Sequence, residues 1–505
     1  MAAPTGEAPS LDTPQPHGRL RGRPWLTLVT IALGAMMVSL DSTVVAVAQP
    51  AMQASLNASL DQIQWVSAGY LIALAALLVV AGKLGDRFGH RRMFLLGTLG
   101  FTAASVAIGM SDGVTSVIAL RVVQGIFGAI MQPPTLALLR ATFPVDRLTL
   151  PIAIRSAVLG TATAAGPVVG GLLVQHGGWH SIFFVNLPIG LVTMVLAGLI
   201  VREVRLDATA TSSDPIGVIL LSAGLVALLW GVIEGPGHGW TQPWVWGPLV
   251  LAAILIPAFL GWERRAPEPL VPLSLFRSGR FSAGVLLMIV VSFVMFGVPF
   301  VLAFFLQRTL HLGALESGVR VLWLTLAMVI SGSLAAIAMR YFGAAVLAVT
   351  GMSIVGVSLL GVAGTADPGG LGTALQAWLV LLGAGFGTVI VTTTHLIVGS
   401  APLRYSGVAG GLQQTAMQIG GSLGTAAIGS LVVLRVAQVF SAETPPSGTS
   451  FDDAVRAIAV GSTDRFGEAG VSAFLSGMNL ALLVAAGAAF AAAAAAAALM
   501  RSPKA

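Results

Sequence analysis

The chain has 505 residues, of which 56% are hydrophobic and only 9% are Asp, Glu, Lys or Arg, and its mean hydropathy is +0.91. A soluble protein of this length could not stay dispersed with so little charge. The net charge of +6 fits the Lys and Arg excess of cytoplasmic loops in membrane proteins rather than a nucleic-acid site, and the lack of cysteine excludes disulfides and thiol chemistry.

Apolar segments of about 20 residues recur along the whole chain, and each is long enough to cross a bilayer as a helix. Backbone groups in lipid must form hydrogen bonds within their own segment, and the sequence lacks the short alternating strands of a barrel, so we predict an all-α integral membrane protein. The fourteen predicted spans are residues 25–50, 64–82, 93–110, 116–138, 151–174, 182–201, 215–234, 243–262, 281–306, 318–339, 344–364, 372–396, 405–434 and 473–499.

The first 24 residues are polar and rich in proline and arginine, which is typical of a disordered cytoplasmic tail. A signal peptide is the competing interpretation, because residues 46–48 (Ala-Val-Ala) are similar to a cleavage site. The apolar run that starts at Trp25 is too long for a usual signal core and contains Asp41. We therefore expect an uncleaved first helix.

The distribution of Lys and Arg predicts which side of the membrane each connection faces. If the N-terminus is cytoplasmic, the even-numbered connections should be basic, and they contain Lys83, Arg87, Arg91, Arg92, Arg140, Arg147, Arg155, Arg202, Arg205, Arg264, Arg265, Arg277, Arg280, Arg340 and Arg404. The first four odd-numbered connections contain neither residue type. The exceptions are Arg308 and Arg320 in the fifth, and Arg456 and Arg465 in the last, which is long and acidic. Both termini are therefore expected in the cytoplasm.

The densest cluster of charge, residues 82–92 (GKLGDRFGHRR), lies between the second and third spans and is expected outside the lipid. Gly89 in this cluster and Gly343 are 254 residues apart, and so are Gly166 in the fifth span and Gly420 in the thirteenth. This weak internal repeat suggests two related bundles, as in many transporters.

The repeat predicts the organisation of the chain. Two six-helix bundles are separated by two inserted helices with cytoplasmic linkers, and the second bundle carries an extracellular loop. The expected segments are a disordered tail at 1–24, the first bundle at 25–201, the inserted helices at 202–280, the second bundle at 281–499 with its loop at about 435–472, and a cytoplasmic tail at 500–505.

Two ionisable residues stand well inside predicted spans, Asp41 in the first and Arg121 in the fourth. A charged side chain there costs roughly 2.5–3.5 kcal/mol, so both are functional candidates. Their depths below the outer surface differ by roughly 6 Å at 1.5 Å per residue. We expect both to face one central cavity in the outer half of the first bundle, with Gln124 on the same helix face as Arg121. The alternatives are a static ion pair, or an Arg121 that snorkels to the interface.

The fifth predicted span is rich in small residues and contains a proline: Gly160, Gly166, Pro167, Gly170 and Gly171. Small residues let helices approach closely, and proline removes a backbone hydrogen bond and bends the helix. Such a helix suits rocking between two states, although ordinary membrane packing also uses scattered glycines.

Two further polar residues end predicted spans. Glu234 is expected at the outer interface, where we favour an ordinary loop acid. His395 ends the twelfth span on the cytoplasmic side. Histidine can titrate near neutrality, but a single one at a helix end is more often structural.

Four motifs in this order resemble the major facilitator superfamily, and specifically its fourteen-helix drug:proton antiporter branch. They are LDSTVV at 40–45, the cluster at 82–92, RVVQG at 121–125 and GPVVGG at 166–171. The resemblance covers nearly the whole chain. It implies the fold of that family, with two six-helix bundles plus two inserted helices, in a bacterial cytoplasmic membrane that the chain crosses many times.

The resemblance also implies roles for individual residues. The loop motif of this branch is a latch that stabilises the outward-open state, and here it comprises Gly82, Asp86, Arg87, Gly89 and Arg91, with Asp86 and Arg87 central. The helix 4 motif implies that Arg121 takes part in proton transfer, and we expect Asp41 to be the coupling acid. The helix 5 motif is typical of exporters, and it comprises Gly166, Pro167, Gly170 and Gly171.

The substrate cavity is expected to be lined from both bundles, with Gln124, Thr43, Ala46, His395 and Gln414 among its residues. Ala46 stands where the helix 1 motif of this branch usually has Asn. We expect that departure to influence substrate choice.

The expected function is proton-coupled export of small organic molecules, as in drug or antibiotic efflux. No enzyme activity, metal or cofactor is expected, because the proton gradient supplies the energy. The expected partners are the substrate, protons and lipid but no nucleic acid, and the chain is expected to be a monomer. The alternatives are proton-coupled uptake of a nutrient, against which the helix 5 motif argues, and a membrane enzyme or sensor. Multidrug export and dedicated export of one antibiotic share these motifs.

Overall fold

The computed structural model describes most of the chain, and every regular element in the described part is helical. The described residues are 21–58, 60–144, 147–204, 214–267, 269–312, 314–366, 373–441 and 449–501. The expected N-terminal tail therefore lies almost entirely outside the described residues, as do 502–505 and part of the first linker. The helices are α1 (Pro24–Leu56), α2 (Leu60–Phe88), α3 (His90–Gly109), α4 (Val114–Thr142), α5 (Thr149–Gly177), α6 (Ser181–Phe184), α7 (Asn186–Ile200), α8 (Pro215–His238), α9 (Pro243–Glu263), η2 (Leu273–Arg277), α10 (Gly279–Phe304), η3 (Phe305–Thr309), α11 (Ala314–Phe342), α12 (Ala344–Thr365), α13 (Thr373–Ser400), η4 (Leu403–Tyr405), α14 (Ser406–Phe440), α15 (Phe451–Ala459) and α16 (Gly467–Arg501).

Thirteen helical segments in the described part are long and apolar enough to cross a membrane, and α5 becomes the fourteenth when its two arms are taken as one bent span. The fourteen predicted spans correspond one to one to α1–α5, α6 with α7, α8–α14 and α16. The prediction of an all-α membrane protein with fourteen spans is thus confirmed. The α-helix α15 was not predicted, and neither were the short helices η2 and η4. Helix α15 lies in the connection between α14 and α16, which is shorter than the expected loop because both neighbouring helices are longer.

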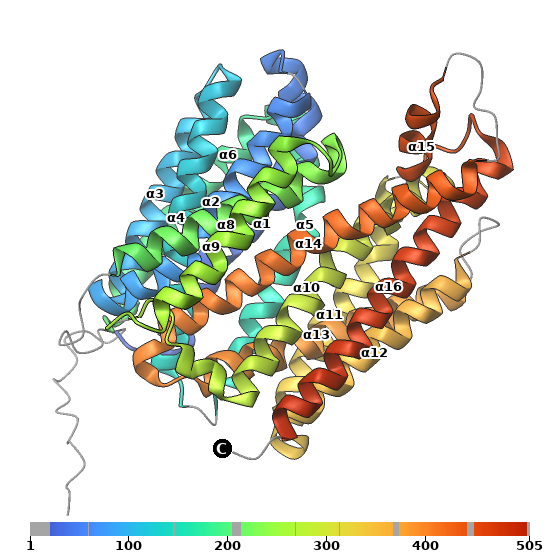
Figure 1. The fold of residues 1–505 in the computed structure, drawn as a ribbon. Helices are drawn as coiled ribbons and strands as arrows, with labels where there is room; N and C mark the ends of the chain where they lie inside the picture. Colours follow the sequence, from blue (N-terminus) through green and yellow to red (C-terminus); the bar gives the residue numbers. More distant parts are fainter. Residues whose placement is uncertain are drawn as a thin grey trace, which may run out of the picture.

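The helices form two bundles (Figure 1). The first contains α1–α7 and the second α10–α16, and the two meet along α2 and α14 on one side and along α5 and α11 on the other. The inserted helices α8 and α9 pack against each other, and α8 also lies against both α2 and α14. The Oγ of Ser222 in α8 donates a hydrogen bond to the carbonyl oxygen of Ala76 in α2, at 3.1 Å.

One apolar core cluster lies in the second bundle, and another lies mainly in the first bundle but also includes Ala336, Met339 and Val391 of the second. The two bundles also share a type of helix contact. Gly166 of α5 packs against Thr43 of α1, and Gly420 of α14 packs against Ile289 of α10. These positions are the ones that the 254-residue offset relates in the sequence. The offset therefore reflects equivalent helix pairs in the two bundles.

The charged cluster at 82–92 is not the loop that the sequence suggested. Residues 82–88 form the last turns of α2, and α3 starts at His90. Gly89 alone reverses the chain between the two helices, with a φ of 101°, a conformation that favours glycine. Gly343 joins α11 to α12 in the same way, with a φ of 77°. We call the end of the molecule that holds Gly89 the loop end, and the opposite one the far end.

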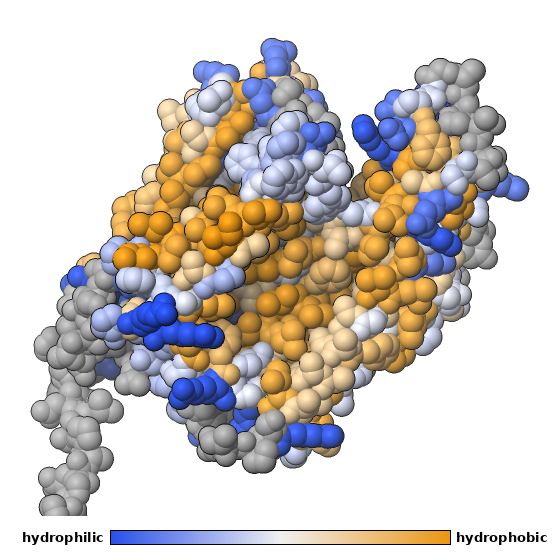
Figure 2. Space-filling model, viewed as in Figure 1, coloured by the Kyte–Doolittle hydropathy of each residue, from blue (hydrophilic) through white to orange (hydrophobic). Residues whose placement is uncertain are grey.

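The two bundles touch at the loop end and stand apart at the far end. Gly82 of α2 packs against the backbone of Gly407 in α14. Arg140 of α4 donates to the carbonyl oxygens of Gly399 and Ala401, at 3.3 and 3.4 Å. Figure 2 shows the surface hollowed between the two bundles at the far end, which is uppermost in that view. Helix α1 begins and α16 ends at the loop end.

Candidate functional site

Asp41 and Arg121 form an ion pair inside the first bundle. The Nη1 of Arg121 in α4 lies 2.5 Å from the Oδ2 of Asp41 in α1. The other carboxylate oxygen, Oδ1, accepts hydrogen bonds from the Nε2 of Gln124 and the Nδ2 of Asn186, both at 3.1 Å. The sequence prediction that Asp41, Arg121 and Gln124 lie together is borne out by this geometry, and Asn186 is an addition to it.

The guanidinium of Arg121 is held on several sides. Its Nη1 donates to the Oε1 of Gln124 at 2.6 Å, and its Nε donates to the carbonyl oxygen of Val66 at 3.0 Å. The guanidinium carbon lies 4.1 Å from the centre of the Tyr70 ring, a favourable cation–π position. These contacts fix the direction of the guanidinium towards Asp41 and offset part of its desolvation.

Asn186 reaches the pair because the sixth span is broken near its start. The four-residue helix α6 ends at Phe184, and Asn186 is the first residue of α7. Its Nδ2 also donates to the Oγ of Ser105 in α3, at 2.9 Å, and that hydroxyl donates to the carbonyl oxygen of Phe183. The signal in the sequence that points to Asn186 is a neutral amide within an apolar span, which carries no charge to mark it as the ionisable residues are marked.

The pair is closed off rather than open to a cavity. The exposed fraction is 2% for Asp41 and 0% for Arg121, and Gln124 and Asn186 are also fully buried. The expectation that both charges face a central cavity is therefore wrong for this conformation, which shows the alternative of an ion pair. The reason is that Gln124 and Asn186 fill the remaining sites around the carboxylate.

The expected latch residues form two kinds of contact, some between the two bundles and some within the first bundle. The Oδ1 of Asp86 accepts a hydrogen bond from the amide of Gly407 in the second bundle, at 3.1 Å, and lies 3.0 Å from the Nε2 of the buried His90. Gly82 packs against the same segment of α14. Asp86 and Gly82 therefore connect the two bundles at the loop end.

Arg91 and Gly89 bind within the first bundle. Arg91 donates from Nε and Nη2 to the carbonyl oxygens of Ala197 and Gly198, at 3.1 and 2.8 Å, and its amide donates to Glu203. Gly89 also lies against Glu203. Arg91 thus ties the start of α3 to the end of α7.

Arg87, expected to be central to the latch, lies with its guanidinium carbon 5.1 Å from the centre of the neighbouring Phe88 ring. Whether Arg87 contributes to a latch stays a prediction.

The exporter motif of α5 packs against the segment that follows Asp41. A Cβ added to Gly166 would overlap the side chain of Thr43, and one added to Gly170 would lie 3.2 Å from the backbone of Val44, whereas nothing lies within 4 Å of such an atom at Gly171. The two arms of α5, Thr149–Thr163 and Val168–Gly177, meet at an angle of 44°. This bend contains Gly166 and lies beside Thr43, two residues after Asp41 in α1.

The other residues that were predicted to line the substrate cavity do not lie together. Thr43 donates to the carbonyl oxygen of Leu40 in its own helix and contacts Gly166. His395 lies partly buried near the end of α13, and Gln414 donates from Nε2 to the Oε1 of Gln132 at 3.3 Å. The side chain of Ala46 lies outside the described part. The described contacts do not join His395 or Gln414 to the Asp41 pair, so the predicted set forms no single cavity in this conformation.

Arg155 requires a correction, because the sequence placed it in a cytoplasmic connection. It is the seventh residue of α5, its exposed fraction is 4%, and it donates to side chains of α4. The predicted fifth span, 151–174, already included this position, and α5 begins still earlier, at Thr149, so Arg155 belongs to the helix and not to the connection.

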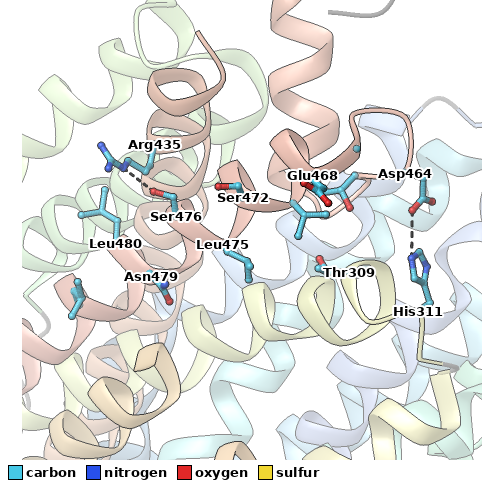
Figure 3. A pocket seen from close by; sticks show the side chains of 14 residues that line it. Thr309, His311, Arg435, Asp464, Glu468, Ser472, Leu475, Ser476, Asn479 and Leu480 are labelled. Atoms are coloured by element: carbon cyan, nitrogen blue, oxygen red, sulfur yellow. Dashed lines mark hydrogen bonds and ion pairs between the residues drawn. The ribbon is translucent and has the colours of Figure 1, made fainter. Parts of the chain in front are cut away.

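A pocket of about 1080 Å³ lies at the far end of the second bundle, beside α14 and α16 (Figure 3). Its walls combine charged, polar and apolar side chains, including Arg435, Asp464, Glu468 and Leu475. Arg435 donates from Nε to the Oγ of Ser476 at 3.0 Å. The pocket includes none of the sequence-predicted site residues, and it is distinct from the Asp41 pair.

Comparison with known proteins gives consistent matches over most of the chain. A family model described as Major Facilitator Superfamily matches residues 31–425. The chain is 45% identical to the tetracenomycin C resistance and export protein of Streptomyces glaucescens over 96% of this chain and 93% of that protein. It is 31% identical to the probable actinorhodin transporter of Streptomyces coelicolor over 83% and 75% of the two chains.

Solved structures share the fold. The crystal structure of the human organic anion transporter MFSD10 matches with a TM-score of 0.64 and 13% identity over 95% of this chain and 100% of that one. The proton:xylose symporter XylE matches with a TM-score of 0.59 and 13% identity over 92% of this chain and 94% of that one.

Proposed function

The chain belongs to the major facilitator superfamily, and we propose that it exports an antibiotic or a related small organic molecule in exchange for protons. The relatives support this activity, because their names describe resistance to tetracenomycin C or methylenomycin A and transport of actinorhodin. The relative named for tetracenomycin C aligns with the chain over nearly the full length of both proteins. Tetracenomycin C is accordingly the first substrate to test.

The observation that carries proton coupling is the buried carboxylate of Asp41. In the described part of the chain, it is the only acid buried in the middle of a spanning helix, since Glu263 ends α9, Asp214 caps α8 and Asp86 lies in the last turn of α2. An ionisable group in that position is costly, and proton transport is a typical reason for its presence.

Protonation of Asp41 would neutralise the carboxylate and remove the attraction that holds Arg121 against α1. Thr43 lies two residues further along α1 and packs on Gly166 at the bend of α5. Loosening the pair therefore acts on the helix contact beside that bend. We propose that the bend of α5 changes as Asp41 gains or loses its proton, and that this change accompanies rocking of the bundles.

The closed loop end suggests which step of the cycle the structure represents. If the loop end faces the cytoplasm, as the basic residues predict, the hollow between the bundles opens to the outside. Asp86 and Gly407 then hold the cytoplasmic end shut while substrate leaves and a proton enters.

The energy available from one proton is sufficient. One charge that moves through 100 mV releases about 2.3 kcal/mol. A tenfold gradient of a neutral drug costs about 1.4 kcal/mol. Exchange of one proton for one neutral molecule therefore sustains a gradient of about fiftyfold from these figures.

Everted membrane vesicles test the proposal. Acidification of the vesicle interior should drive accumulation of tetracenomycin C by the wild-type protein. The Asp41→Asn variant should lose this accumulation, whereas Asp452→Asn, which removes an exposed acid of α15, should retain it. Equal proton-driven uptake by Asp41→Asn and the wild type would refute the assignment of the coupling acid. Expulsion of the drug on acidification would instead indicate uptake as the physiological direction.

A further inference from the structure

Arg155 is a buried cation in a spanning helix that the proton-coupling site does not use. Its Nε donates to the Oγ1 of Thr135 and its Nη2 to the Oε1 of Gln132, both at 3.2 Å. Both acceptors are neutral and belong to α4. No carboxylate of the described residues lies within 4 Å of the Arg155 guanidinium.

Burial of this cation with only neutral acceptors carries a high free-energy cost unless a further partner binds it. A guanidinium at membrane depth is costly, and such residues usually pair with acids or line functional pathways. Asp86, the acid at the loop end of α2, lies against His90 and the Gly407 amide instead. Arg155 therefore keeps a full positive charge that only neutral acceptors stabilise.

The position of Arg155 explains when a partner could reach it. Gln132, which accepts from Arg155, also accepts from the Nε2 of Gln414 in the second bundle, at 3.3 Å. The Arg155 guanidinium is thus covered by a contact between the two bundles. When the bundles separate at the loop end, that contact breaks and the Arg155–Gln132 pair comes to line the opening.

A second guanidinium, that of Arg140, also lies where the two bundles meet at the loop end. Arg140 of α4 donates to backbone carbonyls of the second bundle, and its Nε and Nη1 are buried without a hydrogen-bond partner in the described structure. Separation of the bundles would free these donors as well. The opening at the loop end would then have two cations on one wall.

We propose that Arg155 binds an anionic group of the exported compound, a carboxylate or an ionised phenol, when the loop end is open. The inference rests on the proposed export function and adds to it the chemical class of the substrate. Gln132 supplies an amide that can donate to the same anion, and release follows when Gln414 returns to Gln132 and the bundles close.

A matched pair of probes tests the charge requirement. 7-Methoxycoumarin-3-carboxylate is a monoanion at neutral pH, and 7-methoxycoumarin-3-carboxamide is its neutral counterpart. Proton-driven uptake of each into everted vesicles gives kcat/KM for wild type, Arg155→Gln and Arg155→Lys. Arg155→Gln should lower kcat/KM for the carboxylate about ten- to hundredfold, the range of a charge-assisted hydrogen bond. It should change the value for the carboxamide less than twofold, and Arg155→Lys should retain most carboxylate transport.

The outcomes separate binding from folding. Intact carboxamide transport by Arg155→Gln shows that the variant folds and cycles. Equal losses for both probes would overturn the anion site, because a purely structural arginine predicts that result. Failure of the wild type to transport the carboxylate, while proton-driven export of tetracenomycin C persists, would also overturn it and leave the proposed function standing. Transport of the carboxylate that depends on Arg155 but not on protons would support the site and contradict the antiport.

Discussion

The contact between Gly82 and Gly407 leads to a direct prediction about conformation. A Cβ added to Gly82 would overlap the carbonyl oxygen and carbon of Gly407, which are backbone atoms and cannot rotate away. The Gly82→Ala variant should therefore favour the conformation in which the bundles part at the loop end. Overpacking costs about 1–3 kcal/mol, which corresponds to a shift of roughly 5- to 150-fold in the ratio of the two conformations at 1.36 kcal/mol per tenfold.

The absence of native cysteine makes this shift measurable. Spin labels on cysteines that replace the exposed Phe88 and Leu403 would report the distance between the bundles at the loop end. Labels that replace the exposed Asp112 and Asp452 would report the far end. Electron double-resonance measurements should show the first distance longer and the second shorter in Gly82→Ala than in the wild type.

The matched control is Gly364→Ala in α12, where nothing lies within 4 Å of an added Cβ. It should leave both distance distributions as in the wild type. Unchanged distributions in a folded Gly82→Ala protein would refute the reasoning, because they would mean that the close approach of α2 and α14 does not decide which end is closed.

Three further predictions follow from the site. Arg121→Met should lower the free energy of unfolding by about 3–5 kcal/mol, because it leaves Asp41 buried without its partner. Adding Asp41→Asn should recover part of that loss. Unfolding in detergent measures both variants, and strictly additive losses would contradict an interaction between the two side chains. Gly166→Ala should slow exchange because the new Cβ overlaps both the Oγ1 and the Cβ of Thr43. Thr43→Gly removes both atoms and should restore the rate in the double variant, and a rate that Thr43→Gly does not restore would place the defect elsewhere. Export of a monoanion in exchange for one proton moves two charges across the membrane. A voltage of 100 mV should therefore supply about 4.6 kcal/mol to this transport, compared with about 2.3 kcal/mol for a neutral substrate. Equal loss of uptake of the two coumarin probes when the voltage is collapsed would exclude this stoichiometry.

Much of the fold was predictable because the bilayer limits both the length of each spanning helix and the positions that charged residues can occupy. Every predicted span corresponds to a helix, and the depths of Asp41 and Arg121 predicted that their side chains lie within reach of each other, although the ion pair itself was the alternative to the expected cavity. The helical nature of residues 82–88 was missed, because charge indicates a position outside the lipid but does not indicate where a helix ends.

The residues that the sequence could not place depend on contacts between distant helices. Arg155 was counted with the preceding connection because it is basic and close to the start of its span, and only its packing against Gln132 shows that it is buried. The closure around Asp41 depends on Asn186, which is 145 residues away. Which end of the molecule is closed depends on the conformation adopted, and one sequence has to support both conformations.

Because of the position of α8, the two lines of contact between the bundles differ in how far they are exposed to lipid. Helix α8 bonds to Ala76 of α2 and, through Trp240 just beyond its end, to Ser430 of α14 at 3.1 Å. It therefore covers the joint between the bundles on that side, while the joint between α5 and α11 has no such cover among the described helices. Among the described helices, a hydrophobic molecule dissolved in the bilayer would consequently meet α8 at one contact between the bundles and would meet α5 and α11 directly at the other. We therefore expect any lateral entry from the membrane on the side of α5 and α11.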